Sequence, residues 1–295
     1  MQASVTSQRR VACYRAQPMN LDQERFRGID RLYGVGSTGK LAGAHVCVIG
    51  VGGVGSWAVE ALARSGVGRL TMIDADDICI SNVNRQSHAL DGTFGRNKVE
   101  VLADRIRAIS PGIEVDALGV FLTPSNLDTL LDRGYDLVLD CCDAFRVKVE
   151  MVVWCRRRKL PLIVSGSAGG RTDPTLITSR DLSRTEQDAM LALIRKKLRD
   201  EFQFPRDRKR YFGVTAIYSL ENVRYPQADG SVCGTRPDMV DSLKLDCGAG
   251  LGAAMHVTAA FAMAAVARAL TKLLATVEAD DDSTAHGDQA TRSIA

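Results

Sequence analysis

The sequence of 295 residues contains eight cysteines but no pair with CxxC spacing. Such pairs supply the four thiolates of a common type of structural zinc site, so the sequence gives no support for structural zinc. The cysteines show no regular framework of spacings either, and Cys47, Cys141 and Cys142 fall within apolar runs that are typical of strands. We therefore expect reduced, buried thiols in a cytosolic protein.

The sequence also lacks a large excess of charge of one sign. The formal net charge is +3, charged residues make up 25% of the chain and hydrophobic residues 45%. These values are ordinary for a globular protein, and composition alone gives no reason to expect nucleic-acid binding. There is no internal repeat, and the length suits one α/β domain with tails.

The first 24 residues lack the continuous apolar stretch of a signal peptide. We therefore expect a flexible extension over residues 1–24, no export by the usual route and a cytoplasmic location. Residues 278–295 include three consecutive aspartates among small polar residues, and we expect a disordered acidic tail there. Residues 25–277 remain as the folded domain.

One apolar segment, from Gly248 to Leu274, is long enough to span a membrane. It consists largely of small alanine and glycine residues, and His256 and Arg268 interrupt it. An arginine inside a bilayer is costly. We therefore interpret the segment as a helix buried in a core or dimer interface, and we expect no stable membrane insertion.

Short apolar runs alternate with helical patterns along the first half of the chain. The runs lie at residues 45–49, 70–73, 115–120, 137–139 and 162–164, and helical patterns cover residues 56–64 and the region around residues 99–106. This alternation predicts an α/β fold with a Rossmann-like, doubly wound and mostly parallel sheet. After residue 165 we expect a loop and then a helix over residues 185–202.

A GxGxxG motif, Gly50-Val51-Gly52-Gly53-Val54-Gly55, follows the first apolar run and precedes a helical stretch. In this context the backbone approaches a phosphate, and the amino end of the helix faces the anion. Asp74 ends the next run and is placed to accept hydrogen bonds from ribose hydroxyls. These features predict a bound nucleotide and leave nicotinamide, flavin and ATP open.

A polar cluster that a dehydrogenase does not need follows the second run. Its members are Asp74, Asp76, Ser81, Asn82, Asn84, Arg85, Gln86, Gly95, Lys98 and, later, Asp143. The order GxGGxG, D-x-D, S-N-x-x-R-Q, G-x-x-K and a late Asp resembles the E1-like ThiF/MoeB/HesA superfamily, which includes the bacterial adenylyltransferases of molybdopterin and thiamine biosynthesis. Five motifs in the same order argue against chance.

The resemblance implies an E1-like adenylation domain that uses ATP and Mg²⁺. The implied ATP-binding residues are Gly50, Gly52, Gly53, Gly55, Asp74, Asp76, Asn82, Arg85, Gln86, Lys98 and Asp143, with Asn84 in support. Asp74 would hold the ribose, Asn82 and Arg85 the triphosphate, Lys98 the phosphates near the reacting centre, and Asp143 the magnesium. Attack of a carboxylate on the α-phosphate builds negative charge that fixed cations stabilise. We therefore interpret Arg85, Lys98 and Asp143 as catalytic.

In this superfamily an arginine of the partner subunit reaches the ATP, and residues 25–31 of this sequence occupy the corresponding place. Arg31 is the predicted residue. Arg25 and Arg27 remain alternatives, because the spacing to Gly50 is shorter than in the molybdopterin enzyme. The resemblance thus implies a homodimer.

Four further motifs indicate one branch of the superfamily. They are RLYG at residues 31–34, GSAGG at 166–170, YPQADGSVC at 225–233 and LDCGAGLGAA at 245–254. Together with the missing zinc pairs, they resemble the dehydratases that act on N6-threonylcarbamoyladenosine at position 37 of tRNA. The implied reaction adenylates the threonine carboxylate, and attack from within the same side chain then closes a ring with net loss of water.

Three alternatives remain open. An adenylyltransferase would activate the C-terminal carboxylate of a ubiquitin-like sulfur carrier, a non-catalytic adaptor would only bind nucleotide and a partner, and an oxidoreductase would bind a nicotinamide cofactor. Cys233 lies in a turn-rich context, and the resemblance allows it a persulfide or acyl-acceptor role beside that of an ordinary cysteine. A sulfur-transfer protein and a monovalent cation are further partners that the resemblance allows.

The stretch from Arg195 to Arg210 is locally basic. It holds eight cations against three acids, 8 − 3 = +5, and the cations are Arg195, Lys196, Lys197, Arg199, Arg206, Arg208, Lys209 and Arg210. We predict contacts with phosphates of the tRNA anticodon arm, which are independent of sequence and sensitive to salt. A solvated helix face with an exposed loop is equally compatible with the charges alone.

Overall fold

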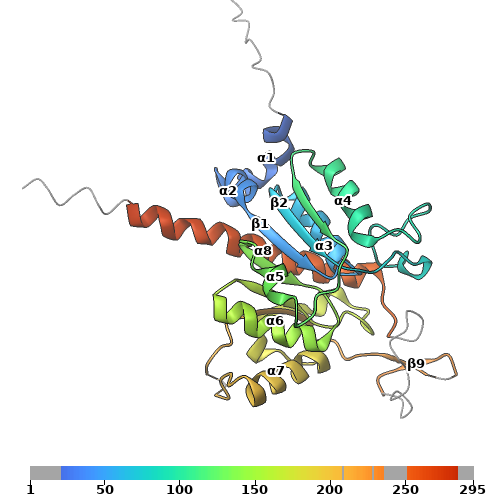
Figure 1. The fold of residues 1–295 in the computed structure, drawn as a ribbon. Helices are drawn as coiled ribbons and strands as arrows, with labels where there is room; N and C mark the ends of the chain where they lie inside the picture. The colour runs from blue at the N-terminus through green and yellow to red at the C-terminus, as the bar shows by residue number, and fades with distance from the viewer. Residues whose placement is uncertain (1–20, 208, 228, 236–250, 285–295) are drawn as a thin grey trace, which may run out of the picture.

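The computed structural model describes residues 21–207, 209–227, 229–235 and 251–284 (Figure 1). Seven strands form one sheet in the order β3-β2-β1-β4-β5-β7-β6, in which only the β6–β7 pair is antiparallel. The strands are β1 His45–Ile49, β2 Arg69–Ile73, β3 Glu114–Leu118, β4 Leu137–Asp140, β5 Leu162–Ser165, β6 Ile177–Asp181 and β7 Thr215–Ser219. The predicted α/β fold with a mostly parallel sheet is confirmed.

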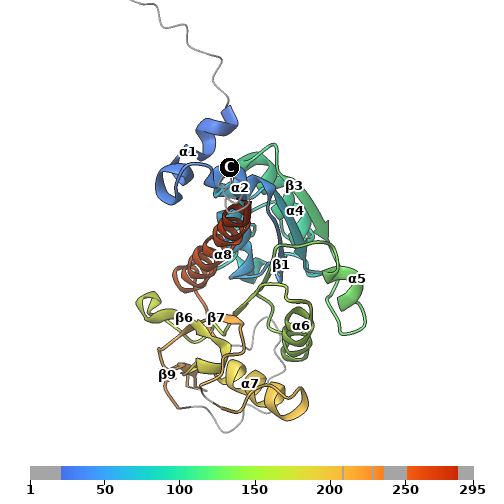
Figure 2. The same cartoon turned by 90° about the vertical axis from the view of Figure 1, so that its left-hand side faces the viewer.

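Helices cover both faces of the sheet. The helices are α1 Leu21–Tyr33, α2 Ser37–Gly43, α3 Gly55–Arg64, α4 Lys98–Ile109, α5 Leu127–Leu131, α6 Phe145–Arg158, α7 Ala189–Glu201 and α8 Met255–Thr284. One core cluster joins α3, α4 and α8 to the sheet, and another joins α5, α6 and α7 to the opposite face. Figure 2 shows α8 and α6 on the two sides of the sheet.

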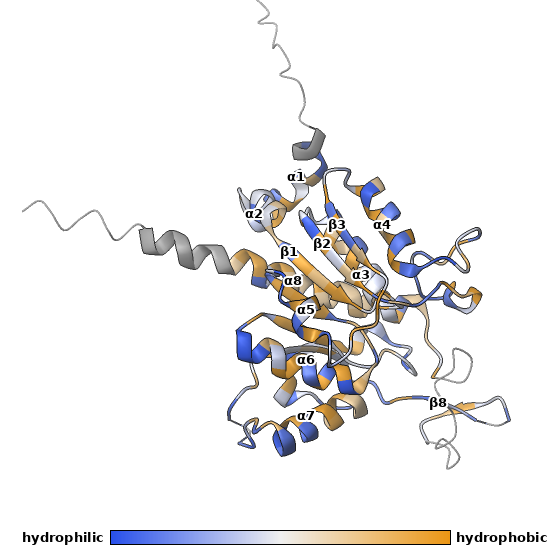
Figure 3. Ribbon diagram, in the orientation of Figure 1, coloured by the Kyte–Doolittle hydropathy of each residue, from blue (hydrophilic) through white to orange (hydrophobic). Residues whose placement is uncertain are grey.

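The central strands are apolar on both faces, as a parallel sheet between two helical layers requires. Every residue of β1 is buried, and successive side chains enter opposite cores. Val46 and Val48 pack with α3 and α8, whereas Cys47 and Ile49 pack with α6. Figure 3 shows the same pattern as hydrophobic colour along the middle of the sheet.

The long apolar segment near the carboxyl end forms α8. Met255–Ala275 satisfies the length and composition of a membrane span, and half of the apolar window is buried inside the protein. Val257, Phe261, Ala265 and Ala269 belong to the core that covers the sheet. The structure therefore places this segment as the predicted core helix.

Three helix ends differ from the bounds that the sequence suggested. Helix α1 begins at Leu21, within the predicted extension, and α8 continues to Thr284, beyond the predicted end of the domain at residue 277. No glycine or proline interrupts α8, so nothing local ends the helix before the aspartates. Residues 1–20 and 285–295 of the predicted tails lie outside the described residues. The predicted helix over residues 185–202 begins only at Ala189, because Asp188 caps its amino end.

Two strands and the placement of two cysteines were missed. Strand β6 lies in the region predicted as a loop, because it has the mixed polar sequence ITSRD of an edge strand, and β7 lies beyond the predicted helix, where no element was predicted. Strand β4 ends at Asp140, so Cys141 and Cys142 lie just beyond it and are partly exposed. Cys47 is buried as predicted, and all the cysteines that the structure describes are unpaired.

The strand order reverses between β1 and β4, which are neighbours in the sheet although β2 and β3 come between them in sequence. In open α/β sheets this reversal leaves a crevice at the carboxyl ends of the two strands. Gly50 follows β1 there with φ +77, and a Cβ on it would lie 2.8 Å from Cα of Cys142. A Cβ on Gly55 would overlap the carbonyl oxygen of Gly50. Glycine is therefore required at both positions.

We predict that Gly55→Ala destabilises the protein whereas Gly52→Ala does not. Alanine has a higher helix propensity than glycine, which stabilises the folded protein by at most about 1 kcal/mol. The overlap of the new Cβ with the Gly50 carbonyl oxygen should cost about 1–3 kcal/mol. Around Gly52 the nearest heavy atom is Nε2 of Gln86 at 3.8 Å, which is ordinary contact. Urea unfolding without nucleotide measures both variants. Equal free energies of unfolding would contradict the close approach.

Candidate functional site

The predicted nucleotide-binding residues come together at the carboxyl edge of the sheet. The glycine loop follows β1, Asp74 follows β2, and Asp143 lies in the exposed segment after β4. The parallel register pairs Ile49 with both Ile73 and Asp140, so the three loops leave the sheet at the same level. The crevice at the reversal of strand order is thus surrounded by residues that the motifs selected.

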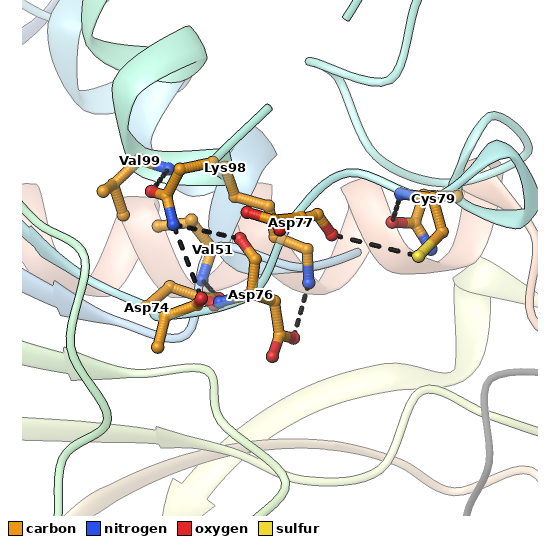
Figure 4. Close-up of polar contacts among 10 residues, drawn as sticks. Val51, Asp74, Asp76, Asp77, Cys79, Lys98 and Val99 are labelled. Atoms are coloured by element: carbon orange, nitrogen blue, oxygen red, sulfur yellow. Dashed lines mark hydrogen bonds and ion pairs between the residues drawn. The ribbon is translucent and has the colours of Figure 1, made fainter. Parts of the chain in front are cut away.

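Asp74 joins the glycine loop to the turn after β2 (Figure 4). Its Oδ2 accepts a hydrogen bond of 2.8 Å from the backbone N–H of Val51, and its Oδ1 accepts one of 2.9 Å from that of Asp76. Burial raises the pKa of the Asp74 carboxyl, and the nearby Lys98 charge opposes this rise. The carboxylate therefore fixes the loop, and its position beside Val51 suits a ribose hydroxyl.

Lys98 is a fixed cation at the amino end of α4. Its Nζ lies 2.7 Å from Oδ2 of Asp76, and the Lys98 side chain is only 7% exposed whereas that of Asp76 is 53% exposed. The backbone N–H of Lys98 also donates to the carbonyl of Asp76 at 3.0 Å. A lysine at a helix amino end opposes the helix dipole, so Asp76 offsets this repulsion. Asp76 thereby fixes the position of the Lys98 ammonium, which stays at the carboxyl edge of the sheet.

Arg85 packs over the glycine loop. A Cβ on Gly53 would lie 3.4 Å from Cγ of Arg85, and Nη1 of Arg85 donates to the carbonyl of Ser81 at 2.7 Å. The backbone carbonyl of Arg85 accepts from Nε1 of Trp57 on α3 at 2.9 Å. Both ends of the residue are therefore anchored, and its aliphatic part packs on the loop that is predicted to bind phosphate.

The other members of the S-N-x-x-R-Q motif support the loop. Oδ1 of the buried Asn82 accepts from the backbone N–H of Cys79 at 3.0 Å and closes the turn η1, Ile80–Asn82. Nδ2 of Asn84 donates to the carbonyl of Ala253 at 2.7 Å, just before α8. The amide of Gln86 is buried and lies toward the glycine loop, 3.8 Å from a Cβ placed on Gly52. In this structure the Asn82 side chain therefore stabilises the turn η1.

The GSAGG segment lies beside the same edge. The N–H of Gly170 donates to the carbonyl of Gly252 at 2.7 Å, and the N–H of Ser167 donates to Oδ2 of Asp188 at 2.8 Å. Asp188 also accepts from Leu191 N–H and so caps α7. Hydrogen bonds of the backbone and of the Asp188 carboxylate therefore join the GSAGG segment to the start of α8 and the start of α7.

A buried ion pair beneath the site was missed from sequence. Nζ of Lys148 lies 2.9 Å from Oδ2 of Asp140, both side chains are fully buried, and Nζ also donates to the carbonyl of Ser165 at 3.0 Å. The negative charge of Asp140 raises the pKa of Lys148 against the lowering effect of burial, which is the largest single influence. The pair ties the ends of β4 and β5 together. A lysine among the apolar residues of α6 was its only sequence signal.

The turn after β3 was missed as well. The N–H of Asp74 donates to the carbonyl of Leu118 at 3.2 Å, so this turn lies directly beside the predicted ribose site. Val120 is 42% and Phe121 65% exposed there. Exposed apolar side chains next to the carboxylate that is predicted to bind ribose would suit an adenine ring.

The predicted partner-subunit arginine lies on α1. Arg25 donates to the carbonyl of Ile109 at 2.7 Å, and Arg27 pairs with Glu24 at 3.1 Å. Arg31 lies exposed in the last turn of the helix. The contacts of Arg25 and Arg27 with their own chain favour Arg31 as the residue that reaches another subunit.

Cys233 lies away from the residues of the glycine loop in the contacts that the structure describes. It forms the short strand β9, Val232–Cys233, which pairs with β8, Tyr225–Pro226. Its Sγ lies 3.6 Å from the carbonyl of Thr235, and the residue is partly exposed. Its reactivity stays a prediction.

The predicted tRNA contacts divide into different environments. Arg195 binds the hydroxyl of Thr185, and Arg199 lies over the ring of Phe212. The remaining described cations of the stretch are Lys197 and Arg206, each paired with an acid, and the exposed Lys196, Lys209 and Arg210. Arg208 lies outside the described residues. The net positive surface is therefore smaller than the sequence count suggested.

Residues 27–287 match the model of the ThiF family. The chain is 45% identical over 253 residues to the tRNA threonylcarbamoyladenosine dehydratase of Escherichia coli, covering 86% of this chain and 94% of that protein. It is equally similar, at 45% over 252 residues, to the protein of that name from Haemophilus influenzae, with 85% and 94% covered. The crystal structure of the E. coli dehydratase in complex with ATP matches with a TM-score of 0.77 and 41% identity, covering 87% of this chain and 96% of that one.

His88, below the loop of Arg85, gives the protein a predicted pH dependence. The side chain is 1% exposed, and neither ring nitrogen has a hydrogen-bond partner among the described residues. Burial, assisted by the charges of Lys98 and Arg105, lowers the pKa of His88 from 6.5 to about 4. Between these two pH values His88 is protonated in the unfolded chain but neutral in the folded protein.

We predict that stability is fully present above pH 6.5 and falls as the pH drops from 6.5 toward 4. The loss attributable to His88 should reach about 3 kcal/mol, at 1.36 kcal/mol for each pKa unit. His88→Leu removes this titration, so its free energy of unfolding should change less over the same interval. Urea unfolding at several pH values measures both slopes, and identical slopes would contradict the prediction.

Proposed function

The chain belongs to the ThiF family, and we propose that it dehydrates N6-threonylcarbamoyladenosine at position 37 of tRNA to the cyclic form, with ATP as the activating substrate. The observation that carries the proposal is the assembly of the glycine loop, Asp74 and Lys98 at one crevice. The similarity to proteins named as dehydratases of this nucleoside supports it over 94% of their length.

The first step is adenylation of the threonine carboxylate. A carboxylate oxygen attacks the α-phosphorus, and pyrophosphate leaves with the electron pair of the broken P–O bond. Charge grows on the phosphoryl oxygens, and cations that need not move stabilise it best. Lys98, held by Asp76, and Arg85, held over the glycine loop, are such cations.

Ring closure is the second step. A nucleophilic group of the same side chain attacks the adenylated carbonyl, AMP leaves with the former carboxylate oxygen, and the net change is loss of water. Because nucleophile and carbonyl belong to one side chain, their effective concentration is high. The protein then has mainly to position the side chain and exclude water, a role that suits the GSAGG segment fastened to α7 and α8.

The carboxyl edge also fits Mg²⁺ bound with ATP. Mg²⁺ prefers one or two carboxylates together with phosphate oxygens, and Asp143 is an exposed carboxylate at the end of β4. Asp140 is already paired with Lys148. We therefore assign the magnesium to Asp143, where the ion would neutralise part of the phosphate charge.

We further propose that the enzyme is a cytoplasmic homodimer in which Arg31 completes the partner's site. Next to Arg31, Leu32 is 71%, Tyr33 40% and Val35 99% exposed. Exposed apolar residues around a cation are typical of a contact with another protein surface. The proposal leaves room for a persulfide or acyl-acceptor role of Cys233. It also leaves room for a sulfur-transfer protein and a monovalent cation as further partners.

We predict that wild-type enzyme with ATP lowers the mass of the threonylcarbamoyl nucleoside by one water, read by mass spectrometry of digested tRNA. Lys98→Met should slow this conversion about 10²- to 10³-fold, because one fixed charge at the transition state is lost. Arg96→Met is the matched control, since this cation of the same turn makes only an exposed 3.5 Å contact with Asp104. It should stay near the wild-type rate.

Exchange of pyrophosphate into ATP separates the alternatives. Exchange that requires a small carrier protein and ignores modified tRNA would favour a sulfur-carrier adenylyltransferase. Tight NAD binding without ATP binding would favour an oxidoreductase, and cellular function that survives Lys98→Met would favour an adaptor.

Mixed dimers test the position of Arg31. An Arg31→Ala subunit keeps Lys98 but needs the arginine of its partner, which a Lys98→Met subunit still carries. Purified mixed dimers should therefore have one complete site of two and about half of the wild-type activity, whereas each variant alone is impaired. Mixed dimers as inactive as the two parents would show that Arg31 acts within its own chain, and a fully active Arg31→Ala parent would show that Arg31 has no role.

A further inference from the structure

A groove of about 740 Å³ lies at the edge of the sheet opposite the glycine loop. Arg180, Asp181, Arg184, Tyr211 and Lys272 line it. The register pairs Asp181 with Thr215 at the start of β7, whereas Ser219 ends β7 at the carboxyl edge. The groove is thus separate from the nucleotide site, and none of these five residues was selected by a motif.

The single acid of this groove is already saturated by backbone donors. Asp181 accepts hydrogen bonds from the N–H groups of Ser183, Phe212, Gly213 and Val214, at 2.9, 2.9, 2.7 and 3.1 Å. These bonds hold the turn that carries Tyr211 against the end of β6. The groove therefore has rigid walls, and its carboxylate is directed at the backbone.

Two arginines of the groove can bind an anion. Arg180 makes one ion pair of 3.1 Å with Glu186, in which both side chains are more than half exposed. Exposed pairs of this kind contribute little, so a phosphate can replace the carboxylate at small cost. Nε of Arg184 is buried without a hydrogen-bond partner among the described residues.

An aromatic surface accompanies these charges. The guanidinium carbon of Arg184 lies 5.1 Å from the ring centre of Tyr211, and Tyr211 is 65% exposed. The exposed Lys209 and Arg210 precede it directly in the chain. Arginine planes and exposed rings beside a basic groove are typical of surfaces that hold RNA phosphates and stack on unpaired bases.

We propose that this groove binds the sugar–phosphate backbone of the substrate tRNA while the modified base lies at the carboxyl edge. The proposal rests on the proposed function. Strand β7 joins the two edges, and its five residues span roughly 15 Å at about 3.3 Å each. A stacked strand advances ~3.4 Å per nucleotide, so phosphates several nucleotides from the base reach the groove. The RNA surface is then the groove with Tyr211, rather than the outer face of α7.

The test combines Arg180→Gln, Arg184→Gln and Lys272→Gln in the full-length protein and measures tRNA binding from low to moderate salt. The slope of log affinity against log salt should fall by about 2 to 3, and affinity at low salt by about tenfold or more. Tyr211→Ala alone should weaken binding without changing the slope. ATP binding should stay as in the wild type in both.

The matched control removes three exposed cations elsewhere, Arg64→Gln, Arg107→Gln and Arg133→Gln, with the same loss of charge. The control variant should keep the wild-type salt slope and the wild-type affinity for tRNA. An equal loss in the control and groove variants would show that only the net charge of the protein matters, and it would overturn the proposal. Wild-type slope and affinity in a folded groove variant would overturn it too. If the triple variant does not fold, Arg184→Gln and Tyr211→Ala are measured singly against the same criteria.

The two proposals fail in different ways. If the wild-type enzyme produces no loss of water from modified tRNA, the proposed function fails whatever the groove does. If the wild-type enzyme dehydrates the nucleoside and the groove variants bind tRNA as tightly with an unchanged salt slope, only the groove assignment fails. A raised KM for tRNA with unchanged ATP affinity in the groove variants is the result that we expect.

Discussion

The site depends on a close approach of backbone to backbone at the reversal of strand order. Gly50 leaves β1 in a left-handed conformation against Cys142, and Gly55 begins α3 against the carbonyl of Gly50. Because neither residue has a Cβ, the amino end of α3 lies directly at the crevice between β1 and β4. Asp74 then receives the N–H of Val51, and from there the turn of Asp76 and Lys98 follows. Any side chain at these two glycines would displace the loop on which the other residues are aligned.

Hydrogen bonds from backbone and side-chain groups join distant segments and make this edge one rigid unit. Asn84 is bound to the residues before α8, Gly252 to Gly170, and Ser167 to Asp188 at the start of α7. Below them, the Lys148–Asp140 pair fixes the ends of β4 and β5, because an unpaired charge in that position would be costly. Cations placed on such a frame need little reorganisation when charge develops on a phosphate, which is the condition for effective electrostatic stabilisation.

The two edges of the sheet suit two different tasks. At the carboxyl edge, a few buried or half-buried charges surround a crevice that is suited to one small phosphorylated ligand. At the other edge, two arginines, a lysine and a tyrosine line a groove whose acid is occupied by the backbone. Reactive chemistry requires fixed charges, whereas a long polyanion is held well enough by exposed, mobile ones that act together. This division explains why short motifs mark the first edge and no motif marks the second.

The sequence by itself determined the alternating strands and helices, the glycine loop and the polar residues after β2 and in the following loop, because each depends on local spacing or on neighbours in the chain. Only the tertiary structure decided which charges matter. Arg195 and Arg199 look like surface cations in the sequence but contact Thr185 and Phe212, while the neighbouring Arg180 and Arg184 line one groove with the distant Lys272. The edge strand β6 was hidden for the same reason, and the burial of the Lys148–Asp140 pair depends on the packing of α6 against the sheet. Pairing across a sheet and burial of a charge depend on partners distant in sequence, and no local pattern records them.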